Sequence, residues 1–280
     1  MSEILVIGGA SLDVLHLSGQ TVTAAGGAAL YTAAAAWRAG AAVTLLAPRP
    51  DPLAELLQPA AARFPWIGPI IDPDQLPRLE IAHYGGGKAA LLSARWGAEA
   101  LLTPADLPDD LSGYRFIHIA ALRSAQRQVD FLRGCRQRGA TRISAGTYGH
   151  VVYDETATVR ALFEQADLFF LNENEANGLF GSVDAACTAA GKLLFVTLGE
   201  RGALVIQGET ITSIAGQDAH EVDPTGAGDT FCGATLAGLA RGLLPVTAAQ
   251  QAAILAAHMI EQIGPAALWH NPHPDSALQP

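Results

Sequence analysis

The sequence predicts an α/β protein with a mostly parallel central sheet, helices on both faces of that sheet, and a small additional β element. Short apolar runs alternate with helical stretches along the 280 residues, and glycine-containing turns separate them. Strands this apolar are buried on both faces, which requires a layer of helices on each side and hence three layers. A hydrophobic fraction of 50% against 16% charged residues excludes an intrinsically disordered chain. We expect one domain over residues 1–280.

The limits of each element follow from hydrophobic periodicity and from the residues that favour helix ends. Gly40 and Gly139 each stand just past an expected helix, where a left-handed residue is favoured. The expected strands cover residues 4–7, 43–47, 116–120, 142–145, 168–171 and 193–198, and the expected helices cover residues 28–39, 52–62, 124–138, 155–165 and 183–190. Residues 203–207 and 210–214 are expected to form a hairpin, and the proline-rich segment 264–280 is expected to be irregular.

Two stretches, approximately 14–25 and 79–102, interrupt this alternation of strand and helix. In the second stretch, apolar runs at 79–84 and 89–95 flank Gly85, Gly86 and Gly87, which predicts a β-hairpin with a flexible tip. Neither stretch fits a strand–helix unit of the central sheet. We therefore expect both to belong to a small, discontinuous β lid that lies off the main sheet.

Charge and cysteine content limit the partners and the compartment. The formal net charge is −10 at pH 7, so nucleic acid and anionic membranes are poor partners, and an anionic ligand must be held by local groups. Cys135, Cys187 and Cys232 form no C-x-x-C pair, which favours a reducing cytoplasm over a disulfide framework or a zinc site. The N-terminal run predicts a buried strand rather than a signal peptide, and no apolar run reaches the roughly 18 residues of a transmembrane helix.

Three widespread motifs are incomplete in this chain. Residues 82–89 lack both the first glycine of a P-loop and the hydroxyl residue after Lys88. Residues 226–231 have Phe231 where a dinucleotide-binding fingerprint needs its third glycine, and residues 9–13 end in Asp13 where a nucleophile elbow needs glycine. The sequence therefore indicates neither a P-loop, nor a dinucleotide-binding fingerprint, nor a nucleophile elbow.

Residues 223–229, with the sequence DPTGAGD, precede a helical pattern that runs to Ala240. The glycines allow a tight turn, and the first amides of a helix, together with the positive end of its dipole, form an anion site. Asp229 stands in the first turn, where the dipole favours an ionised carboxylate that accepts a proton at neutral pH. Amide donors beside such a carboxylate are what phosphoryl transfer to an alcohol requires. On its own, the run is equally typical of a capped helix start.

Residues 223–229 resemble the C-terminal signature D-T-x-G-A-G-D of the ribokinase (PfkB) family of carbohydrate kinases, with Pro224 in place of the usual threonine. Four further matches follow in the order of that family, and with the signature they span most of the chain. They are Asp13 after the first strand, Gly26-Gly27 before an alanine-rich helix, N-x-x-E at Asn172–Glu175, and T-x-G-x-x-G at Thr197–Gly202. Each match alone is typical of a turn, a capped helix start or a hairpin connection, and only their combination indicates one site. The resemblance implies a ribokinase-like fold with a small β lid.

The resemblance also implies a catalytic centre and a nucleotide groove. Asp229 would be the base that acts on the acceptor hydroxyl, and the amides of Gly226, Ala227 and Gly228 would form an anion hole for the γ-phosphoryl group. Thr225 would join Thr197, Gly199 and Gly202 in binding ATP.

The remaining implied residues hold the acceptor and the metal ion. Asp13, Gly26 and Gly27 would bind the acceptor, since glycine permits close approach of the backbone. Asn172 and Glu175 would act through water on Mg²⁺ and phosphate. The implied cofactors are ATP and Mg²⁺, and a monovalent cation is left open. Closure of the lid would exclude water, and an exposed lid edge allows a homodimer.

The acceptor itself stays open, because the chain is short for the family and departs from it near the substrate. Ala28 replaces the lysine of ribokinase proper, and residues 144–150 lack the D-x-N-x-R pattern of many sugar kinases. The run Gly-Gly-Ala-Ala-Leu-Tyr from Gly26 is similar to that of a branch containing inositol kinases, so a sugar, a polyol and a nucleoside all remain. The alternatives are a non-catalytic relative that binds such a ligand, or a kinase for a pyridoxal- or hydroxymethylpyrimidine-type alcohol, for which Cys232 stands close to Asp229.

Overall fold

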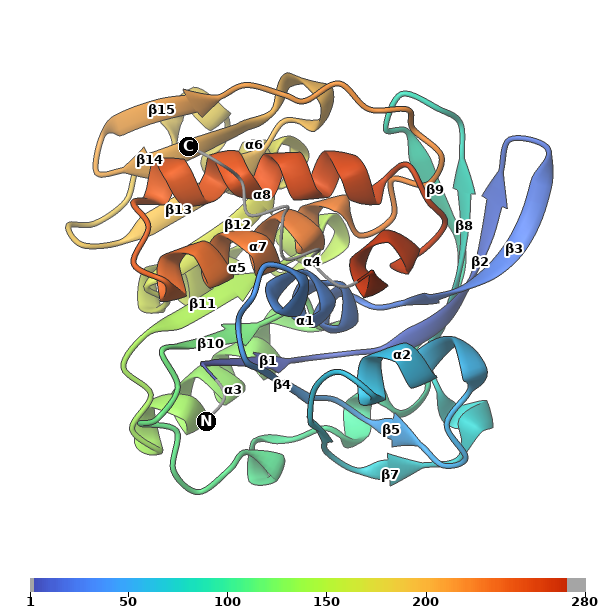
Figure 1. The fold of residues 1–280 in the computed structure, drawn as a ribbon. Coiled ribbons are helices and arrows are strands. Elements are labelled where there is room, and N and C mark those ends of the chain that lie inside the picture. The colour runs from blue at the N-terminus through green and yellow to red at the C-terminus, as the bar shows by residue number, and fades with distance from the viewer. Residues whose placement is uncertain (1–2, 271–280) are drawn as a thin grey trace.

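The computed structural model describes residues 3–270, and within them a nine-stranded sheet runs through the centre of the molecule (Figure 1). The strands lie in the order β15-β14-β13-β12-β11-β10-β1-β4-β6. Neighbouring strands are parallel from β6 to β13, whereas β14 and β15 are antiparallel. Their bounds are β1 (Ile4–Ile7), β4 (Val43–Leu46), β6 (Trp66–Ile67), β10 (Phe116–Ile119), β11 (Ile143–Gly146), β12 (Leu168–Asn172), β13 (Leu193–Thr197), β14 (Ala203–Gln207) and β15 (Thr210–Ile214). The expected mostly parallel sheet is confirmed.

Helices cover both faces of the sheet, because successive residues of a strand point to opposite sides and both sides here are apolar. In β1, Ile4 and Val6 pack into one apolar cluster, and Leu5 and Ile7 pack into another. The first cluster lies under α1 (Ala28–Arg38), α7 (Ala227–Ala240) and α8 (Pro245–Met259). The second lies under α3 (Ala125–Gln137), α4 (Gly149–Asp154), α5 (Thr156–Gln165) and α6 (Glu173–Phe180) (Figure 1). The predicted three-layer α/β architecture is therefore confirmed.

Small residues let α1 and α7 approach each other closely. A Cβ atom on Gly233 would lie 2.1 Å from the carbonyl oxygen of Thr32, so only glycine fits at this crossing. The close approach fixes α7, and with it the DPTGAGD turn, against α1.

A second sheet contains four strands among the described residues, in the order β3-β2-β8-β9. Its strands are β2 (Ser11–Leu17), β3 (Gln20–Gly26), β8 (Arg78–His83) and β9 (Ala89–Arg95). They come from the stretches that interrupt the strand–helix alternation of the sequence. We call this sheet the flap. It lies beyond the carboxyl end of β1, and β9 is its largely exposed edge (Figure 1).

Two expected helices are wrong, and α8 was not expected. Residues 52–62 contain only the 3₁₀ turn η1 (Glu55–Leu57) and the short α2 (Gln58–Ala61), because Pro52 and Pro59 lack the N–H that a longer helix needs. Residues 183–190 contain only the 3₁₀ turn η5 (Val183–Ala185). Here the amide of Thr188 donates to the Gly208 carbonyl at 3.1 Å and its hydroxyl accepts from the Gly208 amide at 2.8 Å, so contacts with the β14–β15 turn replace the helix.

The remaining described elements are short. They are β5 (Arg49–Pro50), which pairs with β7 (Ile70–Ile71), and the 3₁₀ turns η2 (Pro73–Gln75), η3 (Gly97–Leu101), η4 (Pro104–Asp106), η6 (Gly199–Arg201) and η7 (Ala266–Trp269). The segment expected to be irregular, 264–280, contains η7, and its residues 271–280 lie outside the described residues. No helix in residues 3–270 is both long enough and apolar enough to cross a membrane.

Candidate active site

The DPTGAGD turn leads directly into α7. Gly226 immediately precedes the helix with a φ of 79°, a left-handed conformation that glycine adopts without strain. A Cβ atom at this position would lie 2.4 Å from the Tyr31 ring, which packs on the turn from α1. The turn therefore needs glycine at 226 for its backbone conformation and for its packing.

The amides of this turn are not equivalent as donors. The Ala227 amide donates to the carbonyl oxygen of Pro224 at 3.2 Å. Within residues 3–270, the amides of Gly226, Gly228 and Asp229 have no hydrogen-bond acceptor, and no side chain caps the helix. The expected three-amide anion hole is therefore open at Gly226 and Gly228, whereas the Ala227 amide already has an intramolecular partner.

Asp223 is fully buried and fixes the turn. Its Oδ1 accepts from the Thr225 amide at 3.0 Å, and its Oδ2 accepts from the Gly264 amide at 2.7 Å. These donors satisfy a carboxylate that would otherwise be costly to bury. We did not predict a separate role for Asp223, although an aspartate that bonds the backbone two residues ahead is a recognisable turn signal.

Asp229 lies in the first turn of α7 and is half-buried. Desolvation raises the pKa of its carboxyl to about 7. We expected the helix dipole to keep this group ionised at neutral pH; burial acts in the opposite direction and is the larger effect. The carboxyl therefore titrates near neutral pH, where it can both accept and return a proton.

Asn172 and Glu175 form a capping box at the start of α6. The Asn172 side-chain oxygen accepts from the Glu175 amide at 2.9 Å, and the Glu175 carboxylate accepts from the amide and side-chain nitrogens of Asn172 at 2.9 and 2.8 Å. Desolvation raises the pKa of Glu175 to about 8, and the neighbouring charge of Asp229 adds to the rise. Because the two side chains hydrogen-bond to each other, their first role is to cap α6 and not to coordinate a metal ion directly.

Thr197 ends the next strand of the sheet, since it pairs in β13 with Asn172 of β12, and Gly199 and Gly202 follow that strand. A Cβ atom on Gly202 would lie 2.1 Å from the carbonyl oxygen of Ile214, so this glycine is required by packing against β15. Gly199 has a φ of 63° and open space where its Cβ would be. Of these two glycines, only Gly199 leaves room for a ligand.

Asp13 lies in β2, where the flap joins the body of the protein. Its Oδ1 accepts from the Leu79 amide of β8 at 3.0 Å, and a Cβ atom on Gly26 would lie 1.9 Å from its Oδ2. Desolvation raises the pKa of this buried carboxyl to about 6. Gly27 has a φ of 99°, and a Cβ there would lie 2.4 Å from the Gly9 carbonyl oxygen. Asp13 and Gly26 are thus in contact, and both glycines are sterically required.

Tyr31 packs on the turn before α7 from the side of α1. Its hydroxyl is buried and has no hydrogen-bond partner among residues 3–270. Desolvation raises the pKa of the phenol well above its usual value, and the charges of Asp223, Asp13 and Asp229 raise it further. The phenol is therefore within electrostatic range of these three carboxyls. We assigned Tyr31 no role from the sequence, although it belongs to the glycine–alanine run that follows Gly26.

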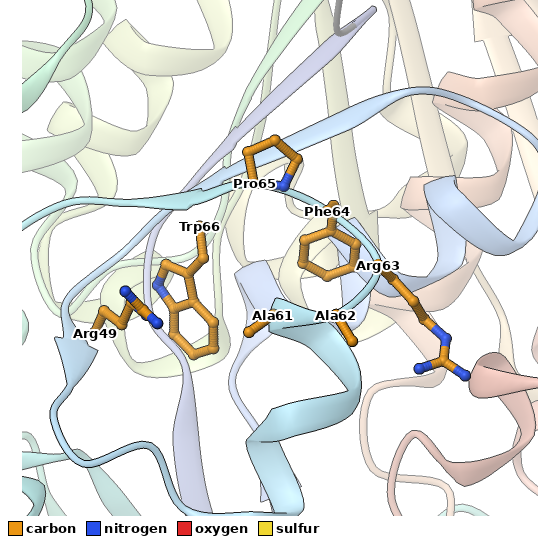
Figure 2. Close-up of a pocket in the computed structure, with 7 residues that line it drawn as sticks. All are labelled: Arg49, Ala61, Ala62, Arg63, Phe64, Pro65 and Trp66. Atoms are coloured by element: carbon orange, nitrogen blue, oxygen red, sulfur yellow. The ribbon is translucent and has the colours of Figure 1, made fainter.

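A hollow of about 360 Å³ lies beside α2. Figure 2 shows residues that line it, among them Arg49, Arg63, Phe64 and Trp66. None of the expected site residues lines it. The guanidinium of Arg63 already donates to the carbonyl oxygens of Pro59 and Trp269 at 3.0 and 2.6 Å. This hollow is therefore separate from the candidate site.

A second cavity, of about 300 Å³, lies between the flap strand β9 and the segment that follows β11. Ala94 and Trp96 line it from the flap side, and Tyr148 and His150 line it from the body. The ring centroids of Trp96 and Tyr148 are 6.0 Å apart. Ala94 is paired with Leu79, the residue whose amide donates to Asp13, so the flap strands connect this cavity to Asp13.

The comparisons with known proteins decide the family. A family model described as pfkB family carbohydrate kinase matches residues 3–272. This chain is a pfkB-family kinase. The predicted membership is confirmed, and membership in this family of kinases makes the chain a phosphotransferase with an alcohol group as acceptor.

Several relatives cover nearly the whole pfkB kinase. This chain is 28% identical to the cytidine kinase of Thermococcus kodakarensis over 252 residues, which are 86% of this chain and 90% of that protein. The adenosine kinase of Sinorhizobium meliloti superposes with a TM-score of 0.81 at 21% identity, covering 97% of this chain and 96% of the other. The ribokinase of Cryptococcus neoformans, solved in complex with ADP, has a TM-score of 0.79 at 19% identity, with coverages of 96% and 97%. The structural likenesses establish the ribokinase-type fold.

Proposed function

We propose that this pfkB kinase transfers the γ-phosphoryl group of ATP to a hydroxyl on the sugar of a nucleoside. The observation that carries the proposal is that Asp229 stands in the first turn of α7, the same turn that holds the unpartnered amides of Gly226 and Gly228. Phosphoryl transfer to an alcohol needs donors that stabilise the developing charge and a base that orients the hydroxyl. One helix turn supplies both.

In this reaction Asp229 accepts the proton of the attacking hydroxyl. A pKa of about 7 means that a large share of the carboxyl is ionised at neutral pH, and the ionised form is the base. Asp13, held by the Leu79 amide and packed on Gly26, accepts hydrogen bonds from other hydroxyls of the acceptor. Orientation by two carboxyls places one hydroxyl in line with the phosphoryl group.

The residues present fit the phosphate end of a nucleotide with Mg²⁺. In the part of the chain that the structure describes, no cluster of three His, Cys, Asp or Glu side chains is able to hold a metal ion by itself. Mg²⁺ commonly keeps several waters and binds through one or two carboxylates together with substrate phosphates. Asn172 and Glu175 would hold that water shell, and Thr197, Gly199 and Thr225 would line the nucleotide groove. When bound, Mg²⁺ neutralises charge on the phosphate oxygens.

The aromatic cavity beside the flap supports a nucleoside as acceptor. Trp96 and Tyr148 offer ring faces on which a planar base can stack, and His150 offers a hydrogen-bonding edge. Tyr148 stands two residues beyond Gly146, which pairs with Phe170, and Asn172 stands two residues beyond Phe170. Tyr148 and Asn172 are therefore at the same edge of the sheet, as one extended acceptor requires. The similarity to a cytidine kinase agrees with this choice.

The alternatives raised by the sequence are less well supported. Cys232 is buried, and desolvation raises the pKa of its thiol well above the usual value, so it packs in the core beside His118 instead of taking part in a pyridoxal-type reaction. A non-catalytic binding protein would need neither unpartnered amides nor a carboxyl that titrates near neutral pH.

An acceptor comparison tests the proposal. Purified protein with Mg²⁺ and ATP is assayed for acceptor-dependent ADP release against pyrimidine and purine nucleosides, ribose, inositol and pyridoxal. We expect kcat/KM for at least one nucleoside to exceed that for ribose by roughly 10-fold or more, the size of one base-stacking contact. Ribose, inositol or pyridoxal as the best acceptor would overturn the nucleoside assignment, and no release with any acceptor would overturn the kinase assignment for these substrates.

A matched pair of tyrosine variants locates the base. Tyr148→Ala removes a wall of the aromatic cavity and is expected to raise the KM for the nucleoside by roughly 10-fold while leaving the KM for ribose unchanged. Tyr153, on the same segment, is 63% exposed and does not line the cavity, so Tyr153→Ala is the control. Equal effects of the two variants would place the base elsewhere.

A further inference from the structure

The flap touches the DPTGAGD turn through a buried histidine. His83, the last residue of β8, places its Nε2 2.9 Å from the Thr225 Oγ1 and 3.6 Å from the Asp223 Oδ1. The His83 side chain is only 6% exposed. A second contact lies nearer the tip of the hairpin, where the Gly87 amide donates to the Glu221 carboxylate at 2.8 Å. Figure 1 shows this hairpin beside the loop that runs from β15 to α7.

The surroundings of His83 are unusual for a residue that only packs. Its Nδ1 is buried and, among residues 3–270, has no hydrogen-bond partner. Leaving a polar atom buried and unpaired costs stability, so a leucine or methionine would fill the same space at lower cost. The group that the imidazole does contact is Thr225, the residue just before Gly226, whose amide is one of the open donors.

We propose that His83 is the positioning residue that couples docking of the flap to the geometry of the anion-binding turn. This inference rests on the proposed function for its catalytic meaning. The Asp223 carboxylate favours a proton on His83 Nε2, which then donates to the Thr225 hydroxyl. The Thr225 amide in turn donates to Asp223 at 3.0 Å, so the flap, the threonine and the buried aspartate form one connected chain of hydrogen bonds.

For the reaction, this coupling means that the flap docks at the same time as the turn carrying the Gly226 and Gly228 amides becomes ordered. Asp13 ties the base of the flap to the acceptor end through the Leu79 amide. His83 ties the other end of β8 to the phosphate end through Thr225. A flap that covers the acceptor therefore also orders residue 225, beside the open amide of Gly226, and water is excluded only when both ends are held.

The two lysines of the chain provide a direct assay of flap docking. Lys88 is exposed at the tip of the β8–β9 hairpin, whereas the Lys192 Nζ donates to the carbonyl oxygens of Glu164 and Ala166 in the body of the protein. A lysine-specific protease therefore cuts at Lys88 in proportion to flap opening and at Lys192 in proportion to opening of the body. The protein carries its own internal control.

We expect His83→Leu to accelerate cleavage at Lys88 by about 3- to 10-fold, the effect of losing one hydrogen bond, with no change at Lys192. His83→Gln, whose amide nitrogen can donate in place of Nε2, should restore the parent rate. His16 also lies in the flap but bonds Glu80 and Thr21 on the flap itself, so His16→Leu is the control and should change neither site. If His83→Leu also accelerates cleavage at Lys192, that variant has loosened the whole protein. Flap docking is then judged from cleavage at Lys88 in His83→Gln, which should match the parent, and in Thr225→Val, which should be faster.

A double-mutant cycle tests the coupling without requiring turnover. Thr225→Val removes the partner hydroxyl and should open the flap as much as His83→Leu does, and the double variant should open it no further. Unchanged cleavage at Lys88 in the single variants, or effects that simply add in the double variant, would overturn the proposal.

The kinetic arm separates positioning from packing. With the best acceptor, His83→Leu should lower kcat by more than it changes the KM for ATP, and His83→Gln should recover most of the loss. If the parent protein turns over no acceptor, the proposed function fails, while the protease cycle still decides whether His83 couples the flap to the turn. A flap effect without any loss of kcat would show His83 to be structural only.

Discussion

Gly226 and Gly228 stand two residues apart in one turn, but the structure gives them different tasks. A Cβ atom at Gly226 would run into the Tyr31 ring at 2.4 Å, on a backbone with a φ of 79°. At Gly228, in the first turn of α7, nothing lies within 4 Å of the position of a Cβ atom. The first glycine is required by the fold, whereas the second has open space where a side chain would be.

This difference predicts opposite effects of alanine at the two positions. Gly226→Ala should lower the free energy of unfolding by at least about 1–2 kcal/mol, the cost of a left-handed alanine, with the clash against Tyr31 adding to it. Gly228→Ala should leave stability unchanged or slightly raised, since alanine favours helix, yet should lower kcat because its methyl group would occupy open space beside the proposed anion hole. Denaturant unfolding together with the ADP-release assay measures both. Equal loss of stability at the two positions would remove the distinction.

For single residues, the sequence predicted which of them lie together but not whether their carboxyls are ionised. The meeting of Asp13 with Gly26 follows from ordered motifs. The raised pKa values of Asp229 and Glu175 do not, because they depend on how much protein surrounds each carboxyl in the folded chain. The role of Tyr31 was missed for the same reason, since its neighbours Asp13, Asp223 and Asp229 are far apart in the sequence.

Among the elements, the starts of α6 and α7 show how the site is left open for a ligand. Asn172 and Glu175 satisfy the first amides of α6 through a reciprocal capping box. At α7 no side chain does so, and the described residues leave the amides of Gly226 and Gly228 without acceptors. Two helices thus meet near Asp229, one capped by its own residues and one available to an anion.

The strands were easier to predict than the helices. Buried β1 is a continuous apolar run, and β10 and β13 are apolar except for His118 and Thr197, so their hydrophobic pattern is detected directly. The helix expected at 183–190 fails because Thr188 pairs with Gly208, a contact between segments distant in sequence. The missed α8 has Pro245 in its first turn and an alanine-rich continuation, and this start signal was available in the sequence.

For the molecule as a whole, the carboxyls of Asp229 and Glu175 lower stability in the neutral pH range, where the proposed reaction would use them. The folded-state pKa values of Asp229, about 7, and Glu175, about 8, lie above those of the unfolded chain. Groups raised in this way bind protons in the folded state that the unfolded state has already released, so their contribution to stability is present at low pH and is lost as pH rises through the folded pKa. The ionised form of Asp229, which is the proposed base, is therefore the less stable form.

We expect the unfolding midpoint of the ligand-free protein to fall as pH rises from 6.5 to about 8.5, with a shallower fall in Asp229→Asn. Desolvation lowers the pKa of buried His118 from 6.5 to about 3, and between these two values His118 makes stability rise with pH. The chosen pH window lies above that range. Thermal unfolding at constant ionic strength measures the midpoint. A flat or rising midpoint in the parent protein would mean that these carboxyls titrate elsewhere.

The most direct test of the account is the rate of phosphoryl transfer in Asp229→Asn with a working acceptor, saturating Mg²⁺ and ATP. The asparagine keeps the shape of the side chain but cannot take the proton of the hydroxyl. We predict a loss in kcat of about 10²-fold or more, with the Kd for ATP within about threefold of the parent value and the fold intact. Transfer within tenfold of the parent rate would contradict the assignment of Asp229 as the base.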